Sequence, residues 1–234
     1  MSLDLSFLDK ESIGNFYDNR ISYLQNRGLS TSHIEKGINE VDRVLDNKIK
    51  SFVIHGEPQS GKTEFMIALT CKILDRDDFE TIFIIMNDNK ELEVQNFKRF
   101  QEASQINPGP QDLQSLESLS DDELKVRKKR IIFCRKNKKN LQKVIELCRF
   151  MKNRLVIDDE ADFATPNTKI NKKDEQTAIN ELVGKLGIFE EGSNTYIGVT
   201  ATPARLDLNN TFGNQSKHWI YLESHPNYKG WEFF

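Results

Sequence analysis

Short apolar runs alternate with longer stretches of helix-like spacing along the chain after residue 48. The apolar runs occupy residues 52–54, 82–86, 131–134, 155–157 and 196–199, and the helix-like stretches occupy residues 65–74, 92–100 and 141–151. Continuous apolar runs of this length are typical of strands buried on both faces, and helices supply the crossovers that join parallel strands. The pattern predicts an α/β fold, in which a mainly parallel sheet carries helices on both faces.

The segments around this alternation have a different character. Residues 1–48 are polar with scattered apolar positions, which predicts short helices packed on one side of the core. Residues 101–123 are rich in Gln, Ser, Asp and Pro, which indicates an insertion or a long surface loop. We expect three units: an N-terminal helical segment (1–48), the α/β domain (49–204) and a C-terminal tail (205–234).

The tail carries many aromatic side chains for a terminal segment. They are Phe212, Trp219, Tyr221, Tyr228, Trp231, Phe233 and Phe234. We expect the tail to pack on the domain, with residues 218–222 as an added strand. Packing against a missing second lobe is the alternative.

Residues 56–63 read Gly-Glu-Pro-Gln-Ser-Gly-Lys-Thr and fit the phosphate-binding pattern G-x-x-x-x-G-K-[ST], between an apolar strand and a helical stretch. Glycines let backbone N–H groups turn towards phosphates, and the helix N-terminus adds to them. Lys62 would neutralise the outer phosphates, and the Thr63 hydroxyl would bind Mg²⁺. The predicted nucleotide-binding residues are Gly56, Glu57, Pro58, Gln59, Ser60, Gly61, Lys62, Thr63 and Glu64. An ordinary glycine-containing turn before a helix is the alternative.

A cluster of acidic residues, 158–162, ends the apolar run 155–157. Mg²⁺ prefers carboxylate oxygen, and a neighbouring carboxylate can activate the attacking water. We assign Asp159 to the metal and Glu160 to the water, so that Lys62, Asp159 and Glu160 form the predicted catalytic set. Asp158 stays open as the metal ligand, because neighbouring strand residues point to opposite faces. We expect this cluster to meet the loop ending in Thr63 across adjacent strand tips. A helix N-terminus decorated with acids is the alternative.

Residues 159–162, Asp-Glu-Ala-Asp, resemble the DEAD motif of superfamily-two helicases. Thr200, Ala201 and Thr202 resemble the third motif of that family, which couples nucleotide state to nucleic-acid binding. Asn87, Leu92, Gln95 and Arg99 resemble its nucleic-acid-contacting element after the P-loop helix. The resemblance implies that residues 49–204 form the first RecA-like lobe of a helicase or translocase, which hydrolyses ATP with Mg²⁺.

A narrower resemblance is to the Z-one domain family of helicases, which are often found with endonuclease or restriction systems. It rests on residues 59–63, on 157–162, on Arg135, Lys136 and Asn137, and on 228–230 with 233–234. Helicases of this superfamily complete the ATP site with a second RecA-like lobe that carries arginine fingers. We expect such a lobe as a partner in cis or in trans, because the chain stops soon after the third motif. The isolated chain should then hydrolyse ATP slowly. No adenine-reading glutamine motif is evident, although Gln25 is available.

Charge distribution points to nucleic acid as a partner. The formal net charge is -3, but residues 125–154 carry many Lys and Arg residues against the single acidic Glu146. This run is a candidate electrostatic footprint, and a solvated basic face is the alternative. We expect DNA rather than RNA to bind, through Asn87, Gln95, Arg99, Arg135 and Lys136.

Composition narrows the remaining choices. The three cysteines are widely spaced and form no C-x-x-C pair, which argues against a disulfide framework or a zinc site. We expect a cytoplasmic protein with no membrane partner, since the sequence shows neither a signal peptide nor a membrane-spanning run. A GTPase is an alternative because residues 171–174 fit N-K-x-D, but a polar run precedes them where a strand is required. A non-catalytic P-loop interaction subunit is another alternative, and a nuclease is a third that no separate acidic cluster supports.

Overall fold

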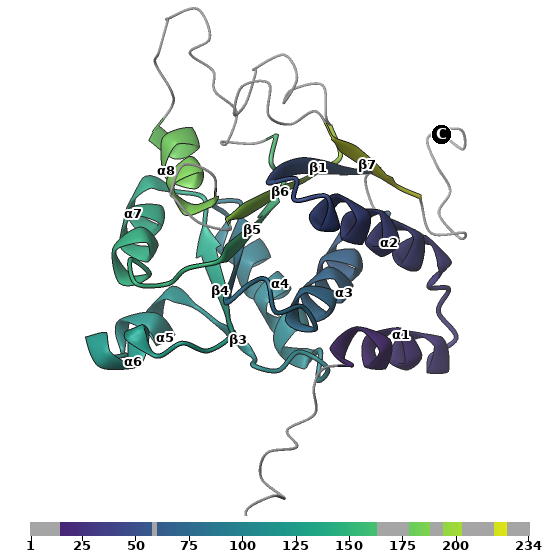
Figure 1. Cartoon of the computed structure of the whole chain (residues 1–234), viewed down its shortest axis with the longest axis horizontal. Coiled ribbons are helices and arrows are strands. Elements are labelled where there is room, and N and C mark those ends of the chain that lie inside the picture. Colours follow the sequence, from purple (N-terminus) through teal and green to yellow (C-terminus); the bar gives the residue numbers. More distant parts are fainter. Residues whose placement is uncertain (1–14, 58–59, 163–177, 188–193, 203–217, 224–234) are drawn as a thin grey trace, which may run out of the picture.

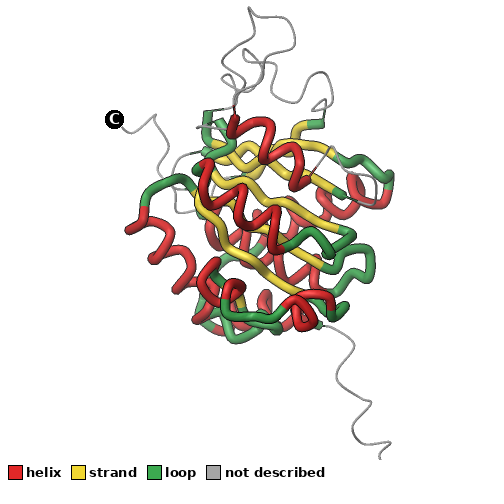
Figure 2. Tube along the Cα trace, turned by 90° about the vertical axis from the view of Figure 1, so that its left-hand side faces the viewer, coloured by secondary structure: helices red, strands yellow, loops and turns green. Residues whose placement is uncertain are grey.

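The computed structural model describes residues 15–57, 60–162, 178–187, 194–202 and 218–223. They build a seven-stranded sheet in the order β3-β4-β2-β5-β6-β1-β7, and every paired strand is parallel to its neighbour. The strands are β1 (Ser51–Gly56), β2 (Thr81–Met86), β3 (Pro110–Gln111), β4 (Arg130–Arg135), β5 (Arg154–Asp159), β6 (Thr195–Thr200) and β7 (Trp219–Leu222). Figure 2 shows them side by side between helices.

Helices cover both faces of the sheet (Figure 1). One face carries α1 (Phe16–Asn26), α2 (Ser32–Asp46), α3 (Lys62–Leu74) and α4 (Lys90–Glu102). The other carries α5 (Leu113–Glu117), α6 (Asp121–Lys125), α7 (Lys138–Leu147) and α8 (Ala178–Gly187). Along β2, Ile82 and Ile84 pack in the first core and Phe83 and Ile85 in the second. Burial on both faces is why the apolar runs are continuous, and the predicted fold class is confirmed.

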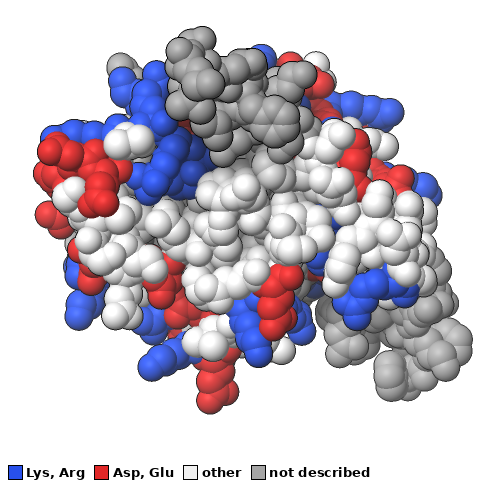
Figure 3. Space-filling model, turned by 90° about the horizontal axis from the view of Figure 1, so that it is seen from below, with Lys and Arg blue, Asp and Glu red and all other residues white. Residues whose placement is uncertain are grey.

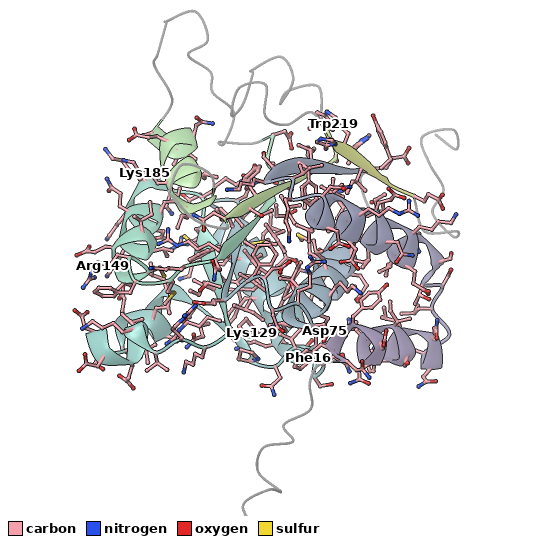
Figure 4. All side chains as sticks on the ribbon, in the orientation of Figure 1. Phe16, Asp75, Lys129, Arg149, Lys185 and Trp219 are labelled. Carbon is pink, nitrogen blue, oxygen red and sulfur yellow. The ribbon has the colours of Figure 1, made fainter. Side chains whose placement is uncertain are left out.

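The N-terminal helices pack on one side of the core, as the sequence predicted for this region. The Asp75 carboxylate accepts hydrogen bonds from the backbone N–H groups of Phe16 (2.9 Å) and Tyr17 (3.0 Å) at the start of α1. These groups have no partner within the helix, so Asp75 satisfies them and fixes α1 to the end of α3. Phe16 and Asp75 are labelled in Figure 4.

The prediction for residues 101–123 needs correction, because this segment is not a structureless loop. It contains β3, α5 and the first part of α6. The Asp112 carboxylate caps α5 by accepting from the backbone N–H of Ser115 at 2.8 Å, and Ser120 begins α6 with a capping box. Leu116 and Leu124 are buried. The polar composition of the segment gives no sign of these two short capped helices, each of which buries one leucine.

The strand predicted at residues 218–222 is confirmed as β7, which pairs in parallel with β1. The sheet thus includes part of the segment that we assigned to the tail. Of the aromatic tail residues, Phe212, Tyr228, Trp231, Phe233 and Phe234 lie outside the described residues. No described helix combines the length and the apolar character that crossing a bilayer requires.

Because the strands are parallel, the loops that follow them meet at the carboxyl edge of the sheet. This is the edge at which α/β sheets bind their ligands. The loops after β1, β2, β4, β5 and β6 begin at residues 57, 87, 136, 160 and 201. Most residues that the sequence selected as functional therefore lie at one edge.

Candidate nucleotide and magnesium site

The described residues of the loop between β1 and α3 have features that suit phosphate binding. Gly61 stands at the N-terminus of α3 with φ +87°, in the left-handed region that favours glycine. A Cβ on Gly56 would lie 2.8 Å from the Ser60 hydroxyl oxygen, so the chain passes too close for a side chain there. The Lys62 ammonium donates to the carbonyl oxygens of Gly56 (3.1 Å) and Glu57 (2.8 Å). These features fit a polyphosphate: a glycine-containing loop, the N-terminus of a helix, and a lysine whose ammonium lies against the loop.

Three carboxylates lie close enough to Lys62 to act on its charge. Burial lowers the pKa of Lys62, and the negative charges of Asp159, Glu160 and Asp162 oppose that shift. Asp158 instead turns into the protein, where its carboxylate pairs with the Lys136 ammonium at 2.9 Å and accepts from the Tyr196 hydroxyl at 2.9 Å. The alternation of strand side chains thus directs Asp159 to the nucleotide loop and Asp158 away from it.

The expectation of adjacent strand tips was wrong in one respect. The sheet order places β6 between β1 and β5, so the nucleotide loop and the acidic cluster flank a third strand. The end of β6 carries Thr200, whose hydroxyl donates to the Asp162 carboxylate at 2.5 Å. The Thr202 hydroxyl donates to the other oxygen of the same carboxylate, and the Thr202 N–H donates to the Thr200 hydroxyl at 3.0 Å. The Thr200–Thr202 motif is therefore joined to the last acid of the Asp-Glu-Ala-Asp motif.

Glu160 occupies a strained position just past β5. Its φ of +50° lies in the left-handed region, which costs a residue with a side chain on the order of 1 kcal/mol. Its N–H donates to the Asp159 carboxylate at 3.1 Å, and its own carboxylate accepts from the Asn87 side chain. The Lys136 ammonium donates to its carbonyl at 2.7 Å. The turn is held by neighbours on the loops after β2 and β4.

Asp159 is half-buried beside other acids. Burial raises the pKa of its carboxyl to about 6, the charge of Glu160 adds to the rise, and Lys136 opposes it. A carboxylate that is costly to ionise without a partner is suited to a cation, which would lower the cost by neutralising it.

The residues predicted to contact nucleic acid are not all free to do so. The Lys136 side chain is 0% exposed and pairs with Asp158, so its assignment to a nucleic-acid surface was wrong. Asn87 donates to Glu160. Arg135 pairs with Glu93 (3.1 Å) and Asp88 (3.6 Å) and stays partly exposed. Gln95 and Arg99 are exposed on α4.

The predicted basic footprint does not form one surface. Arg130 and Arg154 are buried at the amino ends of their strands, whereas Arg135 stands at the opposite, carboxyl edge. Arg149, labelled in Figure 4, pairs with Asp121 at 2.9 Å. On the face shown in Figure 3, Lys and Arg side chains are interspersed with Asp and Glu side chains. The tertiary fold separates residues that are neighbours in sequence, so residues 125–154 form neither a single nucleic-acid footprint nor a single solvated basic face.

A cavity of about 610 Å³ opens beside the start of α3. Its lining combines apolar, aromatic, basic and acidic side chains: Arg20, Tyr23, Leu24, Arg27, Leu29, Ile67, Arg99, Glu102 and Ala103, together with Gly61, Lys62, Thr63 and Glu64. The Glu64 carboxylate accepts two hydrogen bonds from the Arg20 guanidinium, each 2.8 Å long. Gln25 is engaged elsewhere, since its amide donates to the Thr31 hydroxyl at 3.1 Å. Pro58 and Gln59 lie outside the described residues.

The sequence analysis gave no role to Asp162, Tyr196 or Arg20, and it gave Lys136 a different one. Asp162 could have been found, because it is the last acid of the motif already recognised. The role of Lys136 could not, since one lysine in a basic run gives no indication that it is buried. The roles of Lys136, Tyr196 and Arg20 depend on partners that lie far away in the sequence.

The fold and the site define a RecA-like P-loop nucleotide hydrolase lobe. The sequence profile of the SWI2/SNF2 ATPase family matches residues 32–217, which is most of the chain. The chain belongs to the SWI2/SNF2 ATPase family, whose members are ATP-hydrolysing enzymes of helicase type. No curated protein matches it.

Solved structures support the fold. The Hef helicase domain of Pyrococcus furiosus has a TM-score of 0.50 and 17% identity over 82% of this chain and 39% of that one. The Sulfolobus solfataricus SWI2/SNF2 ATPase core, in complex with dsDNA, has a TM-score of 0.51 and 18% identity over 79% and 35%. The DUF1998 helicase MrfA, bound to DNA, has a TM-score of 0.57 and 15% identity over 90% and 30%. The chain thus spans between 30% and 39% of these proteins.

Proposed function

We propose that this chain is the ATP-hydrolysing motor lobe of a helicase or translocase that acts on DNA. The observation that carries the proposal is the position of Lys62, Asp159 and Glu160 at the same, carboxyl edge of the sheet. There the negative charges of both acids oppose the lowering of the pKa of Lys62 by burial. A nucleotide loop and a water-activating acid are the two halves of a nucleotide-hydrolysing site.

Each residue at this edge has one task in the proposal. Lys62 neutralises the outer phosphates of ATP, and the backbone N–H groups of the loop surround them. Thr63 and Asp159 hold Mg²⁺, which supplies charge neutralisation at the phosphate oxygens. Glu160 orients the attacking water and accepts its proton. The cavity beside α3, which Tyr23 helps to line, receives the base and ribose.

The third motif would transmit the phosphate state. Thr200 and Thr202, with Ala201 between them, hold the carboxylate of Asp162 by two hydrogen bonds. A shift of the acidic turn on hydrolysis moves these hydroxyls, because they share one acceptor. That movement reaches the end of β6, next to β1 and β5.

We place DNA at the loops after β2 and β4 and along α4, with Gln95, Arg99 and Arg135 as contacts and Asn87 between that surface and Glu160. Arg99 also lines the cavity beside α3. Lys138 and Lys139 are exposed at the start of α7 and add positive charge there. Contacts of this kind go mostly to the phosphate backbone, so binding should weaken strongly with salt and depend little on sequence.

The proposed partners are DNA and a second RecA-like lobe. Two of the similar proteins, MrfA and the SWI2/SNF2 ATPase core, were solved with DNA, which supports DNA rather than RNA. A second RecA-like lobe, in cis or in trans, would complete the site, and an arginine finger from it is worth about a thousandfold or more in rate. A cytoplasmic location and a link to restriction systems, through the resemblance to the Z-one family, belong to the same proposal.

The test compares nucleotide binding and hydrolysis by the wild-type chain and two variants. Lys62→Ala should weaken ATP binding, and Glu160→Gln should retain binding and lose hydrolysis. The matched control is Lys185→Ala, because Lys185 pairs with Glu181 on the surface of α8. Titration with duplex DNA and with RNA, each at two salt concentrations, identifies the partner.

The alternatives predict different results. A GTPase would prefer GTP in competition, although residues 171–174, which suggested it, lie outside the described residues. A non-catalytic interaction subunit would show equal rates for wild type and Glu160→Gln. Either outcome would remove the proposed motor function.

A further inference from the structure

Lys136 makes an unusual set of contacts for a lysine. Its ammonium is fully buried and donates to the carbonyl oxygens of Asp159 (2.8 Å) and Glu160 (2.7 Å), while it pairs with the Asp158 carboxylate at 2.9 Å. An ammonium has three donors, and these acceptors match them in number. The lysine therefore grips three consecutive residues of the acidic motif at once.

Of the three residues that Lys136 contacts, Glu160 is the one that the sheet does not hold. Asp159 is still paired with Val199 of β6, and the N–H of Ala161 donates to the Val199 carbonyl at 3.0 Å. Glu160 lies between them, outside the strand register and at φ +50°. Its carbonyl bond to Lys136 opposes relaxation to a more common backbone conformation, which would swing the carboxylate away.

Lys136 is itself held from two sides. The Lys136 N–H donates to the Met86 carbonyl at the end of β2, over 2.7 Å. The Asp158 carboxylate that pairs with the ammonium also accepts from the Tyr196 hydroxyl on β6, and burial together with Asp158 raises the pKa of that hydroxyl. The ammonium is thus fixed with respect to β2, β4, β5 and β6.

We propose that Lys136 is a positioning residue for hydrolysis, which sets the direction of the Glu160 carboxylate by holding the backbone of the acidic turn. The inference rests on the proposed function and adds to it a residue that touches neither the phosphates nor the water. Misplacement of a reacting group by about 1 Å can cost on the order of a hundredfold in rate.

The test uses Lys136→Met, with Lys129→Met as its matched control. Lys129, labelled in Figure 4 near Asp75, also donates to two backbone carbonyls, those of Leu74 and Arg76, far from the acidic turn. Because Lys136→Met strands a buried charge on Asp158, the double variant Lys136→Met/Asp158→Asn is measured as well. It removes both charges and still releases the turn.

We expect kcat for ATP hydrolysis to fall about ten- to a hundredfold in whichever Lys136 variant folds, with the Kd for Mg-ATP within about threefold of wild type. Lys129→Met should change neither quantity. In the Glu160→Gln background, Lys136→Met should reduce the residual rate by less than about twofold, because the residue that it positions is already disabled.

A purely structural role gives a different pattern. An unchanged kcat in a folded Lys136 variant, or the same fractional loss with and without Glu160→Gln, overturns the inference alone. If wild type hydrolyses ATP no faster than Glu160→Gln, the proposed function fails and the inference fails with it. Far-ultraviolet circular dichroism and a thermal melt establish which variants are folded.

Discussion

The Thr200 hydroxyl donates to the Asp162 carboxylate over 2.5 Å, and this bond connects the strand in the middle of the site to the acidic motif beside it. The strand order makes the connection direct, since β6 separates β1 from β5. A displacement of the acidic turn would therefore move the end of β6, which lies between the turn and the nucleotide loop. A motor lobe needs such a link between ATP hydrolysis and nucleic-acid binding.

Removing this link should uncouple hydrolysis from nucleic acid. In the double variant Thr200→Val/Thr202→Val, we expect DNA-stimulated ATP hydrolysis to fall about tenfold, or about 1.4 kcal/mol, because two hydrogen bonds to a charged acceptor are lost. Thr195→Val, at the amino end of the same strand, is the control and should keep the stimulated rate. Equal losses in both proteins would contradict a coupling role.

The bond from Asn87 to Glu160 should restrain hydrolysis in the absence of DNA. It occupies a carboxylate oxygen that the attacking water needs. A net hydrogen bond of about 0.5–1 kcal/mol corresponds to about a two- to fivefold effect, so Asn87→Ala should raise the DNA-independent rate by that factor. Steady-state ATPase assays test this, with the exposed Asn26→Ala on α1 as the control. A lower rate in Asn87→Ala would show instead that the amide supports the active position of Glu160.

Local sequence patterns were enough to predict most of the strands. The strands β1, β2, β4, β5 and β6 were predictable because each is a continuous apolar run, and β7 because it repeats the pattern near the end. The short helices α5 and α6 were not, since each buries little more than one leucine in a polar segment. Hydrophobic periodicity reports burial, and these helices bury little.

Residues of the site could be predicted only where a known sequence motif specifies both the residue and its role. Lys62 and Glu160 belong to such motifs. Lys136 does not, and its basic neighbours suggested an exposed surface. The choice between Asp158 and Asp159 needed the packing of Tyr196 and Lys136, because strand alternation gives two faces without stating which one meets the nucleotide. The strand order is likewise set by tertiary packing and not by local sequence.

Asp159 should make the nucleotide-free protein sensitive to pH. The pKa of its carboxyl is raised to about 6 from an ordinary value of 3.8, so the folded state holds the proton more tightly than the unfolded state. Stability then falls as pH rises from about 4 to about 6 and stays lower above that range. In Mg²⁺-free buffer, Asp159→Asn should stabilise the protein by up to about 2 kcal/mol at pH 7.5 and by little at pH 4. Denaturant titrations at both pH values measure the difference, and a variant that is less stable at pH 7.5 would contradict it. The same variant should bind ATP more weakly when Mg²⁺ is present.

The Arg20–Glu64 ion pair should support both stability and nucleotide binding, because it fixes α1 against the start of α3 and lines the cavity there. The Arg20 side chain is 7% exposed and that of Glu64 is 32% exposed, so the pair is screened less than a surface pair. We expect Arg20→Met to lower the free energy of unfolding by about 2 kcal/mol, below the cost of breaking a fully buried pair. Its affinity for ATP should fall about tenfold as the cavity loosens.

The matched control is Lys36→Met, which breaks the exposed pair with Glu223 and should cost less than about 0.5 kcal/mol with no change in ATP affinity. Denaturant unfolding and fluorescent-nucleotide titration measure the two quantities. If the two variants lose equal stability and bind ATP equally well, the Arg20–Glu64 pair is an ordinary surface contact and the cavity does not depend on it.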